Sequence, residues 1–176
     1  MHPSMSTPIQ RRQRGVVLVV GLLLLLVMTV LGVTTIKSTI LEEKMAGNLR
    51  DKDLAFQAAE AALRDGERLV RCNNCALDIN GLTGLNMDCT SSGLCVANGE
   101  LDPVADLRSG AGLEYGVYTG ATALPDDYSS SPRYVVEGIR YWPPGAPGWK
   151  VVYRITAIGH GGTSQATAVH QSVYKP

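Results

Sequence analysis

The sequence lacks the residue patterns that would indicate an enzyme or a calcium-binding protein. It contains no P-loop, no EF-hand loop and no spacing that would argue for a Ser/His/Asp triad. The acidic residues Asp102, Asp106, Asp126 and Asp127 are therefore expected to be solvated loop residues. We predict that the chain is not an enzyme and that it carries no cofactor and no metal.

An excess of basic charge is also lacking. The chain has 16 Lys and Arg residues against 16 Asp and Glu residues, so its formal net charge is zero. A protein whose main task is to hold DNA normally carries a basic groove or stripe, and none is evident here. The balance argues against nucleic acid as a partner.

Charge is absent altogether from the 22 residues between Arg14 and Lys37. As a helix this run would be about 33 Å long, enough to cross a bilayer. A secretory signal peptide would have a shorter apolar core followed by a small-residue cleavage site, which is missing. A buried core helix is disfavoured because no other part of the chain is apolar enough to surround it.

The residues that flank this run predict its orientation. Arg11, Arg12 and Arg14 precede it, whereas Lys37 and Lys44 beyond it are opposed by two Glu residues. The positive-inside bias places the N-terminus in the cytoplasm and exports the remainder, which in a diderm bacterium enters the periplasm. A plain single-span anchor is one interpretation.

Gly15 offers a second interpretation of the same run. A basic leader, then Gly, then an apolar helix is the layout that prepilin peptidase recognises and cuts after the glycine. Glycine there suits a protease that needs an extended, unhindered backbone. The choice between anchor and prepilin depends on the residues that follow.

Those residues are specific. The stretch LEEKMAGNLRDKDLAFQAAEAALRDGE, following RGVVLVVGLLLLLVMTVLGV, closely resembles the N-terminal region of the PilX family of type IV pilus minor pilins. The resemblance covers about residues 12–70, and the rest resembles pilin heads only in broad layout. It implies cleavage by prepilin peptidase after Gly15, methylation of Val16 as the new N-terminus, and incorporation at or near the pilus tip.

The resemblance divides the chain into four parts. They are a leader (1–15), a transmembrane helix (16–36), an amphipathic continuation of that helix (37–71) and a periplasmic head (72–176). The implied partners are other minor pilins, the major pilin and a PilY-type tip adhesin. The implied location is the inner membrane, with the head in the periplasm, and then the pilus tip at the cell surface.

Two positions depart from the major-pilin pattern. The first mature residue would be Val16, where Phe or Met is usual, and the fifth would be Val20, where major pilins carry Glu. That Glu neutralises the terminal amine of a neighbouring subunit, which is costly to leave unpaired in a bilayer. Its absence fits a subunit with nothing ahead of it, and certain tip pseudopilins of type II secretion systems also lack it.

Apolar residues recur at helical spacing beyond the uncharged run and define one stripe. The stripe comprises Leu41, Met45, Leu49, Phe56, Ala59, Leu63 and Val70. We expect its C-terminal half to pack on the protein's own sheet. The part from Leu41 to Leu49 is expected to project beyond the head and to contact neighbouring subunits.

Four cysteines, Cys72, Cys75, Cys89 and Cys95, lie early in the head. Cys72-x-x-Cys75 could be half of a zinc site, but the second pair is separated by five residues and no His lies nearby. Export to an oxidising compartment favours two disulfides. Of the three possible pairings, we favour bridges that join one pair to the other, because Cys72–Cys75 would close a very tight loop.

The C-terminal part predicts strands over residues 133–139, 149–158 and 164–174, with a short one over 115–118. The run Gly159-His160-Gly161-Gly162 supplies the flexible backbone of a hairpin between the last two. A helix packed on such a sheet gives an α+β class: a type IV pilin-like fold with a long N-terminal helix on a C-terminal antiparallel sheet.

The leading hypothesis is a minor pilin that primes type IV pilus assembly and sits in the tip complex. One alternative is a type II secretion minor pseudopilin, built on the same plan. Another is a membrane-tethered periplasmic binding domain, for which the leader would not be cleaved and no co-assembly would occur.

Overall fold

The structure is a computed structural model that describes residues 15–71, 82–90, 92–99 and 101–176. The chain divides into two compact units, one ending at Ala46 and one from Gly47 to Pro176. The predicted leader up to Arg14 and the cysteines Cys72 and Cys75 lie outside the described residues.

The described part of the first unit is the beginning of helix α1 (Val16–Arg71). All of its side chains from Val16 to Ala46 are exposed, although most of them are large and aliphatic up to Ile36. The hydroxyl groups of Thr29 and Thr34 donate hydrogen bonds to backbone carbonyls three residues earlier in the helix, so these polar atoms are satisfied inside the apolar run. By length and composition, α1 is the one helix in the described residues that could cross a membrane.

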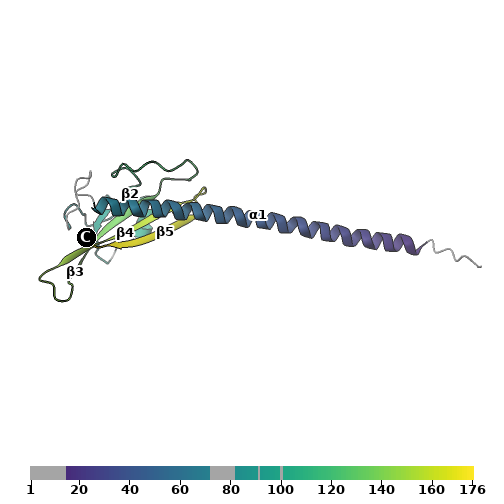
Figure 1. Cartoon of the computed structure of the whole chain (residues 1–176), viewed down its shortest axis with the longest axis horizontal. Helices are drawn as coiled ribbons and strands as arrows, with labels where there is room; N and C mark the ends of the chain where they lie inside the picture. The colour runs from purple at the N-terminus through teal and green to yellow at the C-terminus, as the bar shows by residue number, and fades with distance from the viewer. Residues whose placement is uncertain (1–14, 72–81, 91, 100) are drawn as a thin grey trace, which may run out of the picture. The chain divides into compact units, whose positions relative to one another are not determined.

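The second unit packs the rest of α1 on a twisted sheet (Figure 1). The strand order is β1-β3-β4-β5, and β2 also pairs with β3. The strands are β1 (Leu94–Val96), β2 (Leu113–Glu114), β3 (Arg133–Tyr141), β4 (Lys150–His160) and β5 (Thr167–Tyr174). Strands β3, β4 and β5 form an antiparallel meander, which confirms the predicted α+β class.

The three long strands lie where the sequence predicts them, with shifts at their ends. Strand β4 continues through His160, and β5 begins at Thr167 rather than at residue 164. The hairpin turn is therefore the segment 161–166, closed by a hydrogen bond from Gly161 N to Ala166 O. The predicted hairpin between these strands is correct, but Gly159 lies in β4, and only Gly161 and Gly162 lie in the turn.

Two features of the sheet differ from the prediction. Residues 115–118 form turns instead of a strand, because the chain reverses through Gly116 and Gly120, both of which have positive φ. The strand in this region is β2, which ends at Glu114. The sheet is also not wholly antiparallel, since β1 pairs with β3 in parallel.

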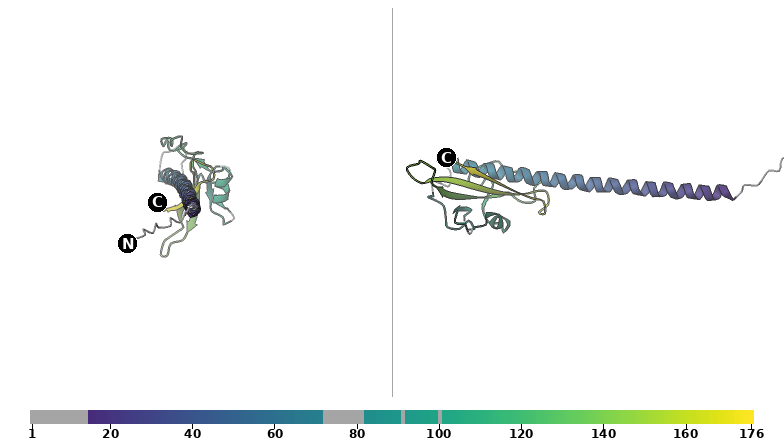
Figure 2. Two further views of the ribbon diagram at one scale, coloured as in Figure 1. Left: turned by 90° about the vertical axis from the view of Figure 1, so that its right-hand side faces the viewer. Right: turned by 90° about the horizontal axis from the view of Figure 1, so that it is seen from below.

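The opposite face of the sheet carries a short helix, α2 (Pro103–Arg108), which was not among the elements predicted from the sequence. Asp102 caps it by accepting hydrogen bonds from Val104 N and Ala105 N, and Pro103 occupies the first turn. Asp102 is therefore a helix cap rather than an ordinary loop residue. Figure 2 shows the sheet between α2 and the C-terminal part of α1.

Candidate assembly interface

The predicted processing site lies where α1 begins. Gly15 is in a turn, the helix starts at Val16, and both residues are exposed. A Cβ atom at Gly15 would meet no other atom within 4 Å. Packing inside this chain therefore does not require glycine at position 15.

Val20 lies one turn into the helix and is exposed like its neighbours. No Asp or Glu occurs in α1 before Glu42. The described start of the helix thus presents an aliphatic surface on every side, which is the pattern of a helix that lies in lipid or among other apolar helices.

Leu41, Met45 and Leu49 form the first part of the predicted stripe. Their spacing of four residues places them on one face of α1, and their exposed fractions are 60%, 58% and 64%. Since large aliphatic side chains so exposed gain nothing from burial within the chain, this row is a surface available to another molecule. We call these three residues the aliphatic row.

The character of α1 changes near Asp51. Beyond it the buried face is made mainly of small residues: Ala55, Ala58, Ala59, Ala62 and Gly66. Leu63, Leu69 and Val70 are also buried. The expected packing of Ala59, Leu63 and Val70 on the sheet is confirmed.

Phe56 is an exception within the predicted stripe, because its exposed fraction is 55%. Its ring meets the edge of His170 on β5, with 4.3 Å between the ring centroids. The face that meets the sheet is therefore rotated away from Phe56 toward the alanines, because the backbone of the sheet comes too close to leave room for a large side chain.

That close approach involves a glycine on β4. A Cβ atom at Gly159 would overlap the backbone nitrogen of Ala59 and the carbonyl oxygen of Ala55. Small residues on the helix and glycine on the strand are thus complementary.

Asp51 ties α1 to the β4–β5 turn. Thr163 donates two hydrogen bonds to its carboxylate, one from the backbone N–H at 3.1 Å and one from the hydroxyl group. The side-chain hydrogen bond from Thr163 is the main cause that lowers the pKa of Asp51 below its usual value. We call this contact the Asp51 clamp.

Asp65 makes a second polar contact between α1 and a turn, and this contact is buried. Only 1% of the residue is exposed. It accepts hydrogen bonds from the backbone N–H of Gly116, at 2.9 Å, and from the hydroxyl group of Thr119. Burial raises the pKa of the neighbouring Tyr134 phenol, and the Asp65 carboxylate raises it further. We call the contact of Asp65 with the turn after β2 the Asp65 clamp.

The edge strand β5 also contacts α1 through polar side chains. Ser172 donates a hydrogen bond to Glu67, and His170 lies 3.4 Å from the carboxylate of Glu60. His170 therefore lies between Phe56 and Glu60 and contacts both. With both clamps, these contacts attach the head to the second half of the helix along its length.

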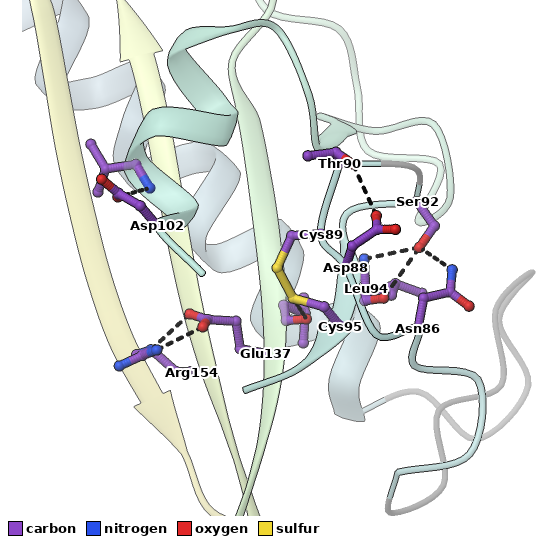
Figure 3. Close-up of a disulfide and its surroundings, with 12 residues drawn as sticks. Asn86, Asp88, Cys89, Thr90, Ser92, Leu94, Cys95, Asp102, Glu137 and Arg154 are labelled. Carbon is purple, nitrogen blue, oxygen red and sulfur yellow. Dashed lines mark hydrogen bonds and ion pairs between the residues drawn. A yellow bond between two sulfur atoms is a disulfide. The ribbon is translucent and has the colours of Figure 1, made fainter. Parts of the chain in front are cut away.

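The other face of the sheet is held by a disulfide and an ion pair (Figure 3). Cys89 is bonded to Cys95, and both are fully buried beside Leu107 of α2. The preference for bridges between the two cysteine pairs is therefore wrong, since the second pair closes on itself. The short loop between Cys89 and Cys95 folds back through Gly93, which has positive φ.

Glu137 on β3 is fully buried and forms a bidentate ion pair with Arg154, its cross-strand partner on β4. The two nitrogen–oxygen distances are 2.7 and 2.6 Å. The hydrogen bond to Glu137 raises the pKa of the Arg154 guanidinium. A buried carboxylate satisfied in this way is a structural element of the sheet.

Among the residues that the structure describes, no three His, Cys, Asp or Glu side chains gather as metal ligands would. His160 lies at the end of β4 in a shallow hollow with Glu114 and Arg133, which form an ion pair of their own at 3.6 Å.

These features define a class: an α+β, pilin-like protein with an N-terminal helix that is long and apolar enough to cross a membrane. The domain described as PilX N-terminal matches residues 14–64, and the domain described as type IV pilus assembly protein PilX C-term matches residues 90–176. Together they cover most of the chain, which belongs to the PilX family of type IV pilus assembly proteins. Its role is that of a minor pilin associated with other pilus components. No curated protein and no solved structure matches the chain.

Proposed function

We propose that this minor pilin primes type IV pilus assembly and remains in the tip complex with other minor pilins. The observation that carries the proposal is the exposure of the aliphatic row, Leu41, Met45 and Leu49, just before the stretch of α1 that packs on the sheet. An interface that fully buries these side chains against a neighbouring helix would stabilise the complex by about 1.5–3 kcal/mol per residue.

Maturation is the first step of the proposed pathway. Prepilin peptidase cleaves after Gly15, and Val16 becomes an N-methylated terminus. The exposed turn at Gly15 and the start of the helix at Val16 support this, because a protease needs an unhindered backbone at the bond it cuts. The positive-inside bias supports a cytoplasmic N-terminus and a periplasmic head.

The proposed tip position depends on Val20. A subunit that enters a filament behind another must neutralise the terminal amine of the subunit ahead of it, and Val20 has no carboxylate with which to do so. A subunit at the front has no such task. The other minor pilins and the major pilin would then assemble behind it, and a PilY-type adhesin would be its companion at the tip.

Substitution of Leu49 in the native strain tests the assembly role. Leu49→Asp places an unpaired charge in the proposed interface, so surface pili and co-purification with other minor pilins should fall sharply. Because Leu49 is 64% exposed, the head should remain folded. The matched control is Gln57→Asp, which places the same charge at an exposed position on the second half of α1.

Normal piliation and normal complexes in Leu49→Asp, or in a strain that lacks the protein, would disprove the priming role. The mass of the mature N-terminus separates the remaining alternatives. A retained leader would indicate a membrane-tethered binding domain, and cleavage with co-purification of secretion components instead of pilus components would indicate a pseudopilin.

A further inference from the structure

The connection between β3 and β4 presents two tryptophans to solvent. Trp142 and Trp149 have exposed fractions of 54% and 61%. Their rings meet edge to face with 5.4 Å between the centroids and an interplanar angle of 81°. These are the two Trp residues of the chain, and neither contributes to its core.

The backbone between them is restricted. Pro143, Pro144 and Pro147 fix three φ angles, and a turn is closed by a hydrogen bond of 3.1 Å from Ala146 N to Pro143 O. The prolines and the turn thus limit the conformations of the connection that carries the aromatic pair, which lowers the entropy that binding would otherwise cost.

The surroundings of the pair are basic, in contrast to the rest of the head. Arg140 and Lys150 are exposed at the ends of the two strands, and Lys175 lies over the Tyr141 ring, 5.8 Å from its centroid. These are three of the six Lys and Arg residues between positions 72 and 176. None of the nine Asp and Glu residues of that segment lies between 138 and 150.

From this juxtaposition we propose that the β3–β4 hairpin tip, residues 140–150, is a docking surface for another protein of the pilus tip, one that offers an apolar pocket rimmed by Asp or Glu. The proposal rests on the proposed tip position. Trp, Tyr and Arg are the residues that most often dominate protein–protein binding, and all three are adjacent here. The basic rim selects an acidic partner and speeds encounter with it.

The geometry favours a protein over a nucleic acid. A platform for bases leaves ring faces free so that successive bases can stack on them. Here the two ring planes are nearly perpendicular, at 81°, so consecutive parallel bases could not stack on both; the pair forms one compact wedge, which fits a pocket better than a row of bases. Three cations also make a small footprint for a polyanion.

Site-specific photo-crosslinking in the native strain tests the proposal. A photoreactive phenylalanine analogue at position 142 should crosslink to another pilus protein in isolated pili. The same analogue at Ser164, exposed in the β4–β5 turn, is the control. The variant Lys150→Glu, and separately Trp149→Ser, should reduce the crosslinked product about tenfold, as expected for loss of a dominant contact.

Both variants change exposed residues, so an unchanged melting temperature of the detergent-solubilised chain should accompany the loss. Equal crosslinking at 142 and 164, or products with lipid, glycan or nucleic acid in place of a pilus protein, would overturn the proposal. These outcomes are separate from the test of priming: pili that form normally without the protein would instead overturn the proposed function.

Discussion

The two stretches of α1 on either side of Asp51 differ in the size and the exposure of their apolar side chains. Before Asp51 the apolar side chains are large and exposed, as at Leu41, Met45 and Leu49, whereas from Ala55 onward they are mostly small and buried. The small ones allow the sheet to approach the helix backbone. Side-chain size therefore distinguishes the surface that packs on the chain's own head from the surface that we propose for contact with other subunits.

The largest expected effect comes from breaking the close approach. Gly159→Ala would push a Cβ atom into the backbone of Ala59, where no rotamer change can relieve the overlap. We expect a loss of about 3 kcal/mol in the free energy of unfolding, measured by chemical denaturation of the detergent-solubilised chain. Gly148→Ala is the control, because a Cβ atom there meets nothing within 4 Å.

Removal of the Asp65 clamp should have the next largest effect. Asp65→Ala leaves the Gly116 N–H and the Thr119 hydroxyl group without their acceptor, which costs about 1–3 kcal/mol. Asp53→Ala, an exposed change of the same type on the same helix, should cost less than about 0.5 kcal/mol. Equal stability of the two variants would show that the buried carboxylate does not hold the turn.

Removal of the disulfide tests whether the face of the sheet opposite α1 contributes to stability independently of the helix. Cys89 and Cys95 are six positions apart, so the chain-entropy estimate for so short a loop is about 2 kcal/mol. The double variant Cys89→Ala, Cys95→Ala should lose about that much stability while keeping the contacts of α1. Alkylation of the exported protein before reduction should label neither residue, and labelling of both would contradict the bridge.

The smallest effect should be the pH dependence of the Asp51 clamp. The folded-state pKa of Asp51 is lowered, so its contribution is present above the unfolded-state value of about 4 and is lost as the pH falls through the folded-state pKa. The stability difference between the wild type and Asp51→Ala should therefore be constant near neutral pH and shrink below about pH 4. A difference that grows on acidification would contradict this sign.

Much of the fold could be predicted from the sequence. The uncharged run and the helical stripe predict α1, and segments rich in Val, Ile, Thr and Tyr predict β3, β4 and β5. Strand β1 and helix α2 have three and six residues, too few for a periodic pattern to emerge. The parallel pairing of β1 with β3 is set by tertiary contacts that no local pattern encodes.

The site was predictable to a lesser degree. The exposure of the aliphatic row could be predicted from its place along the helix. The rotation of the packed face away from Phe56 could not be predicted from the sequence. Hydrophobicity alone favours burial of Phe over Ala, and only the glycine at position 159 reverses that preference. Nor could the sequence choose among the cysteine pairings or reveal that Asp65 is buried, because the disulfide depends on which loop packs on the far face of the sheet and Asp65 on which turn packs on the helix.

The two clamps have a mechanical consequence. Asp51 and Asp65 are 14 residues apart on one helix, a separation of about 21 Å along its axis. A pull on the N-terminal end of α1 reaches Asp51 first, but the alanine face between the two clamps engages the sheet over the whole interval. Tension is therefore spread as shear over many contacts loaded together, and no single hydrogen bond has to withstand it alone.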